Sequence, residues 1–516
     1  RNTGREMSEE NLAPAAGQAE SGAVEQEMNN LMQQRMLKVR ELREAGVEPF
    51  GRAFPGAQMI GDVRDTAAPA EGEEFGPVVT VAGRLMAKRG MGKSIFADLK
   101  DSSGKIQLFV GKSEIGDDAF AMFKKLDIGD IIGISGPTFV TRMGELTVRV
   151  KECTLLSKSL RPLPEKFHGL QDVEQRYRQR YLDLIMNDES FRVLKLRSRI
   201  LAEIRNFMND RGFLEVETPM LQPLAGGASA NPFKTYYEAL SSTMYMRIAP
   251  ELYLKRLLVG GFEKVYELNR NFRNEGMDRR HNPEFTMMEV YQAYGDCRTM
   301  MELIESLVTT VAMKTVGTLK IDHGNGKVID LTLPWRRATY NELCEEKGGA
   351  DWFKITPEER VARGREMGLD IPDGMSDLDV TNELYEKMVE PTLIQPTFVC
   401  RLPVELLPLA KGCPDDPRYV DVFELGINGV EVAPAYSELN DPIIQRQRFM
   451  EQFERTKEEG DKLSDKVDED FLNALEYGMP PAGGMGIGID RLVMILTGAE
   501  TIRDVLLFPQ MRLKKQ

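Results

Sequence analysis

The sequence has few of the residues that build disulfide frameworks and zinc sites. It contains only five cysteines and three histidines among 516 residues, and no two cysteines have C-x-x-C spacing. This composition excludes a disulfide-rich secreted fold and a zinc cluster of thiolates and imidazoles. No apolar run approaches the roughly 20 residues that a membrane-spanning helix needs, and no segment has the pattern of a signal peptide. We therefore expect a cytoplasmic protein without a membrane segment.

An excess of basic charge is also absent. The chain has 67 Lys and Arg against 81 Asp and Glu, for a net charge of −14. Such a chain does not bind nucleic acid indiscriminately through its overall charge, so any RNA partner must be bound by a local patch.

The first part of the chain has the pattern of a small nucleic-acid-binding barrel. Residues 1–27 lack aromatics and predict a disordered tail, and a helix with a basic face follows at 28–45. Five β-type runs then occur at 78–86, 94–99, 105–110, 131–135 and 145–150, with one helical stretch at 117–126 after the third run. This order is typical of an OB-fold barrel, which binds single strands by stacking bases on aromatic side chains. We place this domain at 28–160, with Phe96, Arg84, Gln107 and Arg142 as candidate RNA-binding residues.

The rest of the chain, 161–516, predicts one larger α+β domain. A helical pattern at 196–208 precedes a strand at 213–217, and further β-type runs occur at 244–248, 264–271, 284–291, 420–425 and 429–432. Residues 342–395 have the pattern of a helical insertion, and helices near 443–477 and 490–498 close the chain. We expect an antiparallel sheet flanked by helices, and not a Rossmann fold.

The strongest chemical signal is a hairpin that combines phosphate-binding and base-binding groups. Phe272-Arg273-Asn274-Glu275 is followed by a polar loop and then by His281-Asn282-Pro283-Glu284-Phe285. An arginine can hold a phosphate or a carboxylate with two parallel hydrogen bonds, a glutamate can accept from an adenine amino group, and a phenyl ring can stack on a base. The string therefore predicts a nucleotide-activating site.

This string resembles motif 2 of the class II aminoacyl-tRNA synthetases. Residues 212–219 resemble motif 1, which builds the dimer interface of that class, and residues 486–492 resemble motif 3. Four other stretches, 247–255, 281–286, 437–442 and 502–505, resemble the bacterial-type, class IIb lysyl-tRNA synthetases. The resemblance covers residues from about 28 to 513, including the barrel.

The resemblance implies a homodimeric enzyme that activates L-lysine with ATP and Mg²⁺ and transfers it to the 3′ end of tRNA(Lys). The residues support lysine independently, because a buried ammonium needs carboxylate partners, and Glu289 and Glu438 supply two, with Tyr291 as a further acceptor.

The same resemblance implies a role for each site residue. Catalysis would rest on Arg273 and Arg491, and Mg²⁺ on Glu424 and Glu431. The ATP site would comprise Arg273, Glu275, His281, Asn282, Phe285, Glu424, Gly488 and Arg491. The lysine site would comprise Gly227, Glu251, Arg273, Glu289, Tyr291 and Glu438, and the anticodon site Arg84, Phe96, Gln107 and Glu145.

Three positions depart from the usual family pattern. Asn231 stands where arginine is common, Tyr236-Tyr237-Glu238 replaces His-His-Asn, and Pro434 replaces an asparagine that contacts the substrate carboxylate. Two other functions therefore stay open: a related enzyme that attaches a lysine analogue to a protein, and a catalytically silent tRNA-binding paralogue. Relatives of the first kind lack the barrel, and the intact charged residues argue against the second.

Overall fold

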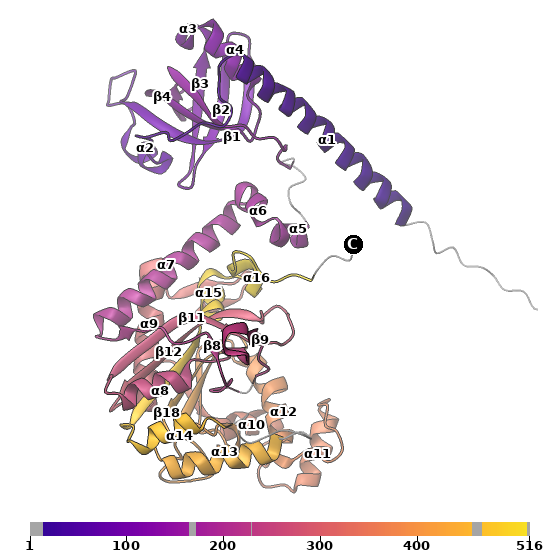
Figure 1. Ribbon diagram of the computed structural model, residues 1–516, viewed down its shortest axis with the longest axis vertical. Helices are drawn as coiled ribbons and strands as arrows, with labels where there is room; N and C mark the ends of the chain where they lie inside the picture. Colours follow the sequence, from indigo (N-terminus) through magenta and orange to yellow (C-terminus); the bar gives the residue numbers. More distant parts are fainter. Residues whose placement is uncertain (1–13, 165–171, 229, 457–466, 513–516) are drawn as a thin grey trace, which may run out of the picture. The chain divides into compact units, whose positions relative to one another are not determined.

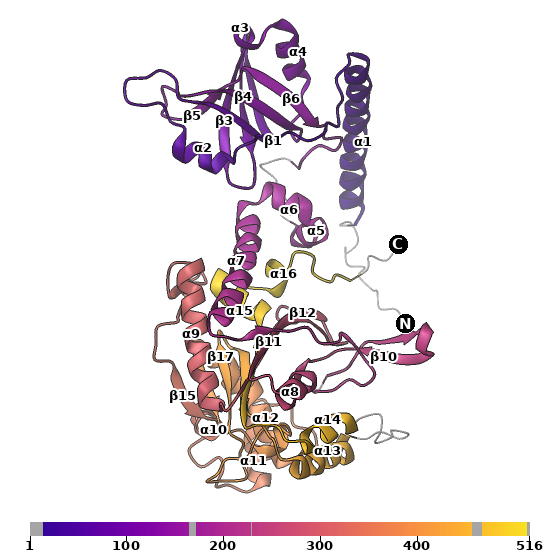
Figure 2. The same ribbon diagram turned by 60° about the vertical axis from the view of Figure 1, so that its left-hand side comes forward.

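The computed structural model describes residues 14–164, 172–228, 230–456 and 467–512. The chain divides into two compact units, Arg1–Gly169 and Leu170–Gln516, which are described separately below. Most of the helices and many of the strands of both are labelled in Figures 1 and 2.

The first unit is a β-barrel with short helices. Its strands are β1 (Val78–Met91), β2 (Ser94–Lys100), β3 (Lys105–Gly111), β4 (Ile131–Val140), β5 (Leu146–Arg149) and β6 (Glu152–Ser157). Its helices are α1 (Pro14–Glu44), α2 (Ile60–Thr66), α3 (Lys112–Ile115) and α4 (Asp117–Lys125). The strand order is β1-β2-β3-β5-β4-β6, and β1 also pairs with β4, which closes the sheet on itself.

Alternating burial explains why these segments form a barrel. In β2, Ile95, Ala97 and Leu99 are buried in the barrel core, while Phe96 and Lys100 lie on the partly exposed face. The OB-fold prediction, with a helix between the third and fourth strands, is confirmed. The sequence analysis missed β6, which pairs with β4 in addition to the five expected strands.

Helix α1 begins earlier than we predicted. It starts at Pro14 rather than at residue 28, so the predicted disordered tail overlaps the helix, and residues 1–13 lie outside the described part of the chain. The segment after Pro14 is rich in Ala, Glu and Gln, which are strong helix formers, and this propensity outweighs its lack of aromatics. On the predicted basic face, Lys38 Nζ lies 2.6 Å from Asp127 Oδ1, and Arg35 donates to the Ser159 carbonyl at 2.9 Å.

The second unit is built on one large sheet. Its strands are β7 (Leu214–Glu215), β8 (Leu221–Gln222), β9 (Lys234–Tyr237), β10 (Ser242–Met246), β11 (Lys264–Phe272), β12 (Glu284–Ala293), β13 (Lys320–Asp322), β14 (Val328–Asp330), β15 (Arg336–Thr339), β16 (Thr397–Cys400), β17 (Val422–Ile427), β18 (Val430–Ser437) and β19 (Ala482–Gly488). The large sheet has the order β15-β16-β17-β18-β19-β12-β11-β7 and is mostly antiparallel.

Helices cover this sheet and form the predicted insertion. The longer ones are α7 (Asp188–Asp210), α8 (Glu251–Val259), α9 (Cys297–Thr315), α13 (Pro442–Thr456), α14 (Glu469–Glu476) and α15 (Ile489–Thr497). Shorter ones are α5 (Val173–Arg178), α6 (Arg180–Met186), η1 (Glu238–Leu240), η4 (Val404–Leu406) and α16 (Ile502–Val505). The insertion contains α10 (Tyr340–Gly348), α11 (Pro357–Glu366), α12 (Asp377–Leu384), η2 (Tyr385–Val389) and η3 (Glu390–Thr392).

The main core lies between one face of the sheet and three helices. Met288 and Val290 of β12 and Phe423 of β17 pack there against α7, α9 and α15, which lie side by side on that face (Figure 2). Because side chains alternate along a strand, the residues between these apolar positions point to the opposite face. That opposite face carries most of the predicted site residues of the second unit.

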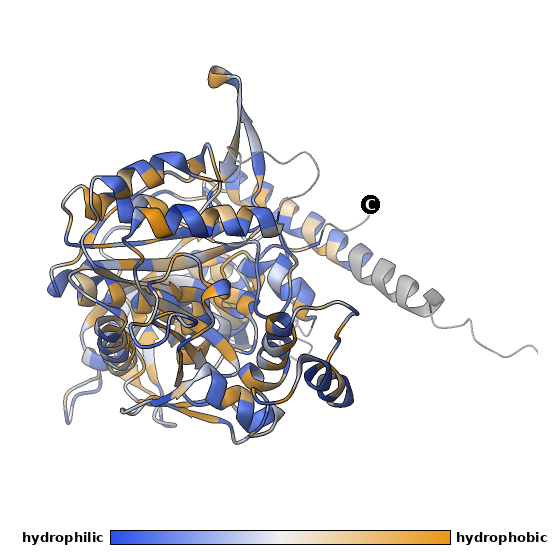
Figure 3. Cartoon of the chain, turned by 90° about the horizontal axis from the view of Figure 1, so that it is seen from below, coloured by the Kyte–Doolittle hydropathy of each residue, from blue (hydrophilic) through white to orange (hydrophobic). Residues whose placement is uncertain are grey.

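Polar and apolar residues alternate along the elements of both units (Figure 3). Among the described residues, no helix is both long enough and apolar enough to cross a membrane.

Candidate functional site

The open face of the sheet is lined alternately by charged side chains and glycines. Glu289 of β12 lies opposite Gly486 of β19, and Tyr291 lies opposite Gly484. A Cβ added at Gly484 would lie 1.9 Å from Glu438 Oε1 and 2.6 Å from the Tyr291 ring. No larger residue fits at Gly484 unless the Glu438 carboxylate moves. The absence of a side chain at Gly484 therefore leaves the space that this carboxylate occupies.

Three carboxylates of the predicted lysine site are buried. Glu438 is 1% exposed, Glu289 is 4% exposed and Glu251 is 6% exposed. Glu289 Oε2 accepts a hydrogen bond from the Tyr291 hydroxyl at 3.0 Å. Glu438 Oε1 has no hydrogen-bond partner in the described structure. A buried carboxylate oxygen without a partner is costly, so this geometry favours a cationic ligand.

Burial also changes the protonation of these carboxyls. Burial, with Glu251 as the nearest added negative charge, raises the pKa of Glu289 to about 8. Burial raises the pKa of Glu438 to about 7, although the adjacent Lys255 ammonium opposes this rise. A ligand ammonium would favour the ionised form of both groups, since an opposite charge stabilises a carboxylate.

Gly227 closes the other side of this pocket. Its φ is +85°, in the left-handed region that glycine adopts readily, and a Cβ there would lie 3.1 Å from the Cβ of Glu251. The structure thus brings Gly227 next to Glu251, as the predicted lysine site requires.

Arg273 lies at the end of β11, beside the phenyl ring that the sequence pairs with it. Its main-chain N–H donates to the Pro283 carbonyl at 2.8 Å, and its guanidinium carbon lies 5.1 Å from the Phe285 ring centroid. Its Nε is buried without a hydrogen-bond partner in the described structure. Burial raises the pKa values of Glu289 and Glu431, and the Arg273 charge opposes this rise at both carboxyls, so Arg273 acts on both the lysine side and the metal side of the site.

Arg491 and His281 meet across the site. Arg491 Nη2 lies 3.0 Å from His281 Nε2, and His281 Nδ1 lies 2.8 Å from Asp278 Oδ2. Arg491 Nη1 also donates to the Glu431 carbonyl at 2.6 Å. The loop of motif 2 and the helix of motif 3 are therefore joined by side chains that the sequence assigns to ATP.

Gly488 and Asp490 fix the start of α15. A Cβ at Gly488 would lie 3.5 Å from the Val432 carbonyl oxygen. Asp490 is buried, pairs with Arg197 of α7 at 2.6 Å, and accepts from the Thr286 N–H at 2.8 Å. Sequence reasoning passed over Asp490, which ties Arg491 to α7 and β12.

Glu275 and Asn282 differ in solvent exposure and therefore in how accessible their side chains are to a ligand. Glu275 is exposed, and its Oε1 accepts from the Asn231 N–H at 3.4 Å. Asn282 is 9% exposed, donates to the Glu284 carbonyl at 2.6 Å, and accepts from the Gln510 N–H at 3.2 Å. The contact with Gln510 holds the C-terminal segment against the hairpin. The predicted role of Asn282 in ATP binding stays a prediction.

The two predicted metal carboxylates lie near each other beside the insertion. Burial and the charges of Glu431 and Glu390 raise the pKa of Glu424 well above its usual value. The hydroxyl of Tyr385, from η2, lies 3.4 Å from Glu424 Oε2, and Glu390 Oε1 accepts from the Glu431 N–H at 2.8 Å. In the described ranges no three His, Cys, Asp or Glu side chains form a complete metal site. Two carboxylates completed by nucleotide phosphates would still suit Mg²⁺.

The departures from the family pattern fall in three places. Pro434 lies in β18 directly opposite Glu424, on the open face of the sheet. Tyr236 and Tyr237 lie in β9 and are 55% and 45% exposed. The main chain of Asn231 accepts from the Asn274 N–H at 2.7 Å and so supports motif 2 through its backbone.

In the barrel, the predicted anticodon residues lie on one aromatic face. The rings of Phe96 and Phe109 are 5.2 Å apart, and Phe109 is also 6.1 Å from Phe139. The Thr147 hydroxyl oxygen lies 3.0 Å from Gln107 Oε1 and 3.1 Å from the Glu145 carbonyl oxygen, so its single proton is donated to one of these two acceptors at a time. This hydroxyl therefore lies between Gln107 and Glu145, two of the predicted residues of the anticodon site.

Arg84 has an internal partner. The strand register places it on the same face as Phe96, but its guanidinium donates to the Gly129 carbonyl at 2.8 Å and is half-buried.

Arg149, which was not predicted from the sequence, lies over the Phe75 ring at 5.1 Å and near the Phe109 ring at 5.9 Å. Strand alternation could have revealed Phe109 and Arg149, because each lies two positions from a residue of the same face.

Two buried ion pairs beside the lysine site were also missed. Arg247 Nη1 lies 2.6 Å from Glu267 Oε1, and Lys255 Nζ lies 2.7 Å from Glu251 Oε1. The spacing of Glu251 and Lys255, one helical turn, was the available signal for the second pair.

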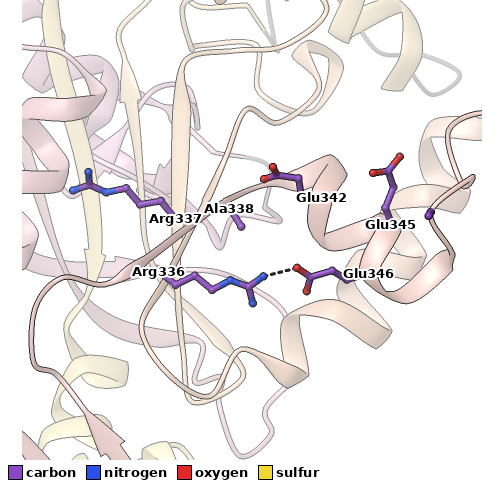
Figure 4. A pocket seen from close by; sticks show the side chains of 7 residues that line it. Arg336, Arg337, Ala338, Glu342, Glu345 and Glu346 are labelled. Atoms are coloured by element: carbon purple, nitrogen blue, oxygen red, sulfur yellow. Dashed lines mark hydrogen bonds and ion pairs between the residues drawn. The ribbon is translucent and has the colours of Figure 1, made fainter.

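A separate pocket of about 490 Å³ lies at the edge strand β15 and helix α10, lined by Arg336, Arg337, Ala338, Glu342, Glu345, Glu346 and Ala350 (Figure 4). Arg336 and Glu346 form an ion pair across it at 2.5 Å. The lining shares no residue with the predicted site, and its own charges are partly paired.

Comparison with known proteins agrees with both units. Residues 172–512 match the family of class II tRNA synthetases (D, K and N), and residues 79–156 match the OB-fold nucleic acid binding domain. The chain is 52% identical to the lysine–tRNA ligase of Syntrophomonas wolfei over 95% of its own length and 98% of that protein. It is 52% identical to that of Carboxydothermus hydrogenoformans (94% and 99% covered) and 51% identical to that of Staphylococcus aureus (95% and 100% covered). The chain therefore belongs to the class II tRNA synthetases, in the family of the lysine–tRNA ligases.

Proposed function

We propose that the chain activates L-lysine with ATP and transfers the lysyl group to the 3′ end of tRNA(Lys). The observation that carries this proposal is Glu438: a buried carboxylate with one unpartnered oxygen, seated over Gly484 and beside Tyr291. Such a group suits the side-chain ammonium of lysine. A neutral or acidic side chain would leave it uncompensated.

The first step needs no nucleophile from the protein. A carboxylate oxygen of lysine attacks the α-phosphorus of ATP, the bond to the pyrophosphate oxygen breaks, and lysyl-adenylate and pyrophosphate form. Arg273 would hold the carboxylate and the α-phosphate, and Phe285 and Arg491 would cover the two faces of the adenine. Catalysis of this kind consists of orienting the reactants and neutralising charge that develops on phosphate oxygens.

Mg²⁺ would be held by Glu424 and Glu431. Glu424 and Glu431 carry like charges that repel each other in a partly buried setting, and a divalent cation would relieve this repulsion. Their hard oxygen atoms are the ligands that Mg²⁺ prefers. When bound, the ion would neutralise phosphate charge. Tyr385 and Glu390 would orient these two side chains from the insertion.

In the second step, a hydroxyl at the 3′ end of the tRNA attacks the lysyl carbonyl and AMP leaves. Selection of the tRNA would rest on the barrel face with Phe96, Gln107 and Glu145, where an aromatic surface can stack bases. Because Arg84 has an internal partner, we assign it a smaller share of this binding.

The chain would act as a homodimer in the cytoplasm. Motif 1 contains β7, the edge strand of the large sheet next to β11, where Leu214 is 56% exposed. An edge strand with exposed apolar residues is a natural pairing surface.

ATP–pyrophosphate exchange with each of the twenty amino acids, followed by aminoacylation of tRNA(Lys), tests the proposal. We expect exchange with lysine above all others, and a loss equivalent to about 3–5 kcal/mol in E438Q, since one partner of a buried charge pair is removed. E358Q, which changes an exposed carboxylate of the insertion, is the matched control.

Exchange with a lysine analogue alone would favour the protein-modifying enzyme. A folded protein that binds tRNA but shows no exchange with any amino acid would favour the silent paralogue.

A further inference from the structure

Helix α8 carries a lysine whose ammonium is buried inside the amino-acid pocket. Lys255 is 0% exposed, and its Nζ lies 2.7 Å from Glu251 Oε1 and 2.5 Å from Glu438 Oε2. Glu251 lies one turn earlier on the same helix, whereas Glu438 follows β18. A single in-chain ammonium therefore joins the carboxylates that are expected to bind the two ends of the substrate.

We propose that Lys255 is a positioning residue of the amino-acid pocket, which fixes Glu251 and Glu438 and sets the pocket to accept a substrate with two ammonium groups. This inference rests on the proposed function, because it assumes that Glu251 and Glu438 contact the substrate.

The charges around the pocket support the second part of the proposal. Glu251, Glu289 and Glu438 supply three carboxylates, and Lys255 offsets one of them. Glu267 is excluded from this count because it is already paired with Arg247 at 2.6 Å. When bound ammonium groups hold all three carboxyls in the ionised form, two negative charges remain, and these match the α-ammonium and the side-chain ammonium of a diamino acid.

The two carboxylate oxygens of Glu438 have different surroundings, and this difference supports a positioning role for Lys255. Neither oxygen has a hydrogen bond of good geometry in the described structure, but Oε2 forms an ion pair with Lys255 Nζ at 2.5 Å, whereas Oε1 has neither kind of partner and lies next to Gly484. Lys255 thus holds one oxygen of the carboxylate and leaves the other for a ligand.

The other groups that face this cluster do not replace the Lys255 charge. Tyr291 of β12 and Tyr436 of β18 have pKa values raised well above the usual range by burial and by the surrounding carboxylates, so both phenols stay neutral. Burial raises the pKa values of both Glu289 and Glu438; Arg273 is among the cations that oppose this rise at Glu289, whereas Lys255 is the cation that opposes it at Glu438. Burial and the Glu251 charge both raise the pKa of Glu438. Removing Lys255 therefore leaves Glu438 protonated to a higher pH.

The test compares K255M, K255R and R256M in the full-length protein. Arg256 is the matched control, because it is the next residue of α8 but pairs with Asp468 at 2.7 Å. For K255M we expect the KM for lysine in the exchange reaction to rise about 100-fold at pH 7, as expected when a binding group is misplaced. We also expect this KM to fall about tenfold per pH unit from pH 7 to 9, since one carboxyl must lose its proton before the ammonium binds. The KM for ATP should change less than about twofold.

Calorimetry in buffers of different ionisation enthalpy supplies a second measurement. Lysine binding to K255M should release more protons at pH 7 than binding to the wild type. K255R keeps the charge, so its pH profile should follow the wild type even if its larger head group raises KM. K255R also keeps the proposal testable if K255M fails to fold.

A lysine KM in K255M that rises equally at all pH values, or that matches R256M, would overturn the inference. So would a pH profile of K255R shifted like that of K255M. If the wild type itself shows no lysine-dependent exchange, the proposed function fails, and that outcome is distinct because it does not involve the variants.

Discussion

Replacing Gly484 with alanine should impair lysine activation and spare ATP binding. The added Cβ would lie 1.9 Å from Glu438 Oε1, whereas ordinary contacts begin at 3.4 Å. The carboxylate oxygen would therefore have to move by about 1.5 Å, the difference between these two distances. Glu438 cannot make this shift alone, because it is 1% exposed and its other oxygen lies 2.5 Å from Lys255 Nζ.

The magnitude follows from the precision that binding groups need. A displacement of about 1 Å at a reacting or positioning group can cost about 100-fold in rate. We expect kcat/KM for lysine in ATP–pyrophosphate exchange to fall by at least this factor in G484A. Crowding of the Tyr291 ring, 2.6 Å from the new Cβ, should add about 1–3 kcal/mol of destabilisation.

The control is G412A in the same unit. Gly412 does not have a left-handed φ, and a Cβ there meets only the Tyr419 carbonyl oxygen at 4.0 Å. Exchange is measured against lysine at saturating ATP and against ATP at saturating lysine, with folding checked by thermal unfolding. A folded G484A protein whose lysine KM and kcat match those of G412A would refute the reasoning, because Glu438 would then not be the group that reads the substrate.

Three further predictions address the other parts of the site. R273A should lower the exchange rate by about 10²–10³, because a fixed donor to the α-phosphate is lost; a near-normal rate under saturating substrates would falsify the assignment. F96A should weaken tRNA binding by about 1–3 kcal/mol through lost base stacking and leave tRNA-independent exchange unchanged, as measured by filter binding beside the exchange assay. The lysine KM should fall as pH rises from about 6 to 8, because burial keeps Glu438 (pKa about 7) and Glu289 (pKa about 8) protonated at lower pH and only the ionised carboxylates hold an ammonium. A lysine KM that is flat over this range, with the ATP KM as reference, would contradict that protonation scheme.

Much of the fold could be predicted because burial alternates with the period of each element. Ile95, Ala97 and Leu99 give β2 a regular buried face, and Phe120 and Phe123 do the same for α4. Strand β6 escaped notice because its burial does not alternate cleanly, with only Leu155 fully buried. The start of α1 was predicted wrongly because composition suggested disorder where helix propensity decided the outcome.

The site was only partly predictable because its contacts join distant segments. The glycines at 484, 486 and 488 have the spacing of a single strand face, so a close approach at that face could be foreseen. The ion-pair partner of each buried charge could not be foreseen, since nothing in the sequence near Lys255 identifies Glu438 as its partner. The same holds for Asp490 and Arg197, and for Glu390, whose contact with Glu431 depends on how the insertion packs on β18.

The departures from the family pattern affect one end of the substrate more than the other. Pro434 has neither an amide side chain nor a main-chain N–H, and it faces the same side of the sheet as Glu424. Tyr236 and Tyr237, which could have supplied a replacement donor, lie on the exposed β9 strand, so under the proposed function the lysine carboxylate would depend more heavily on Arg273. The ammonium end keeps Glu438, Glu289, Tyr291 and the buried Lys255. Selectivity for lysine depends on the charged side chain, whereas the carboxylate is common to all amino acids. The loss of one donor at the carboxylate end should therefore lower the affinity for lysine by about one neutral hydrogen bond, 0.5–1.5 kcal/mol, and leave the choice of amino acid unchanged.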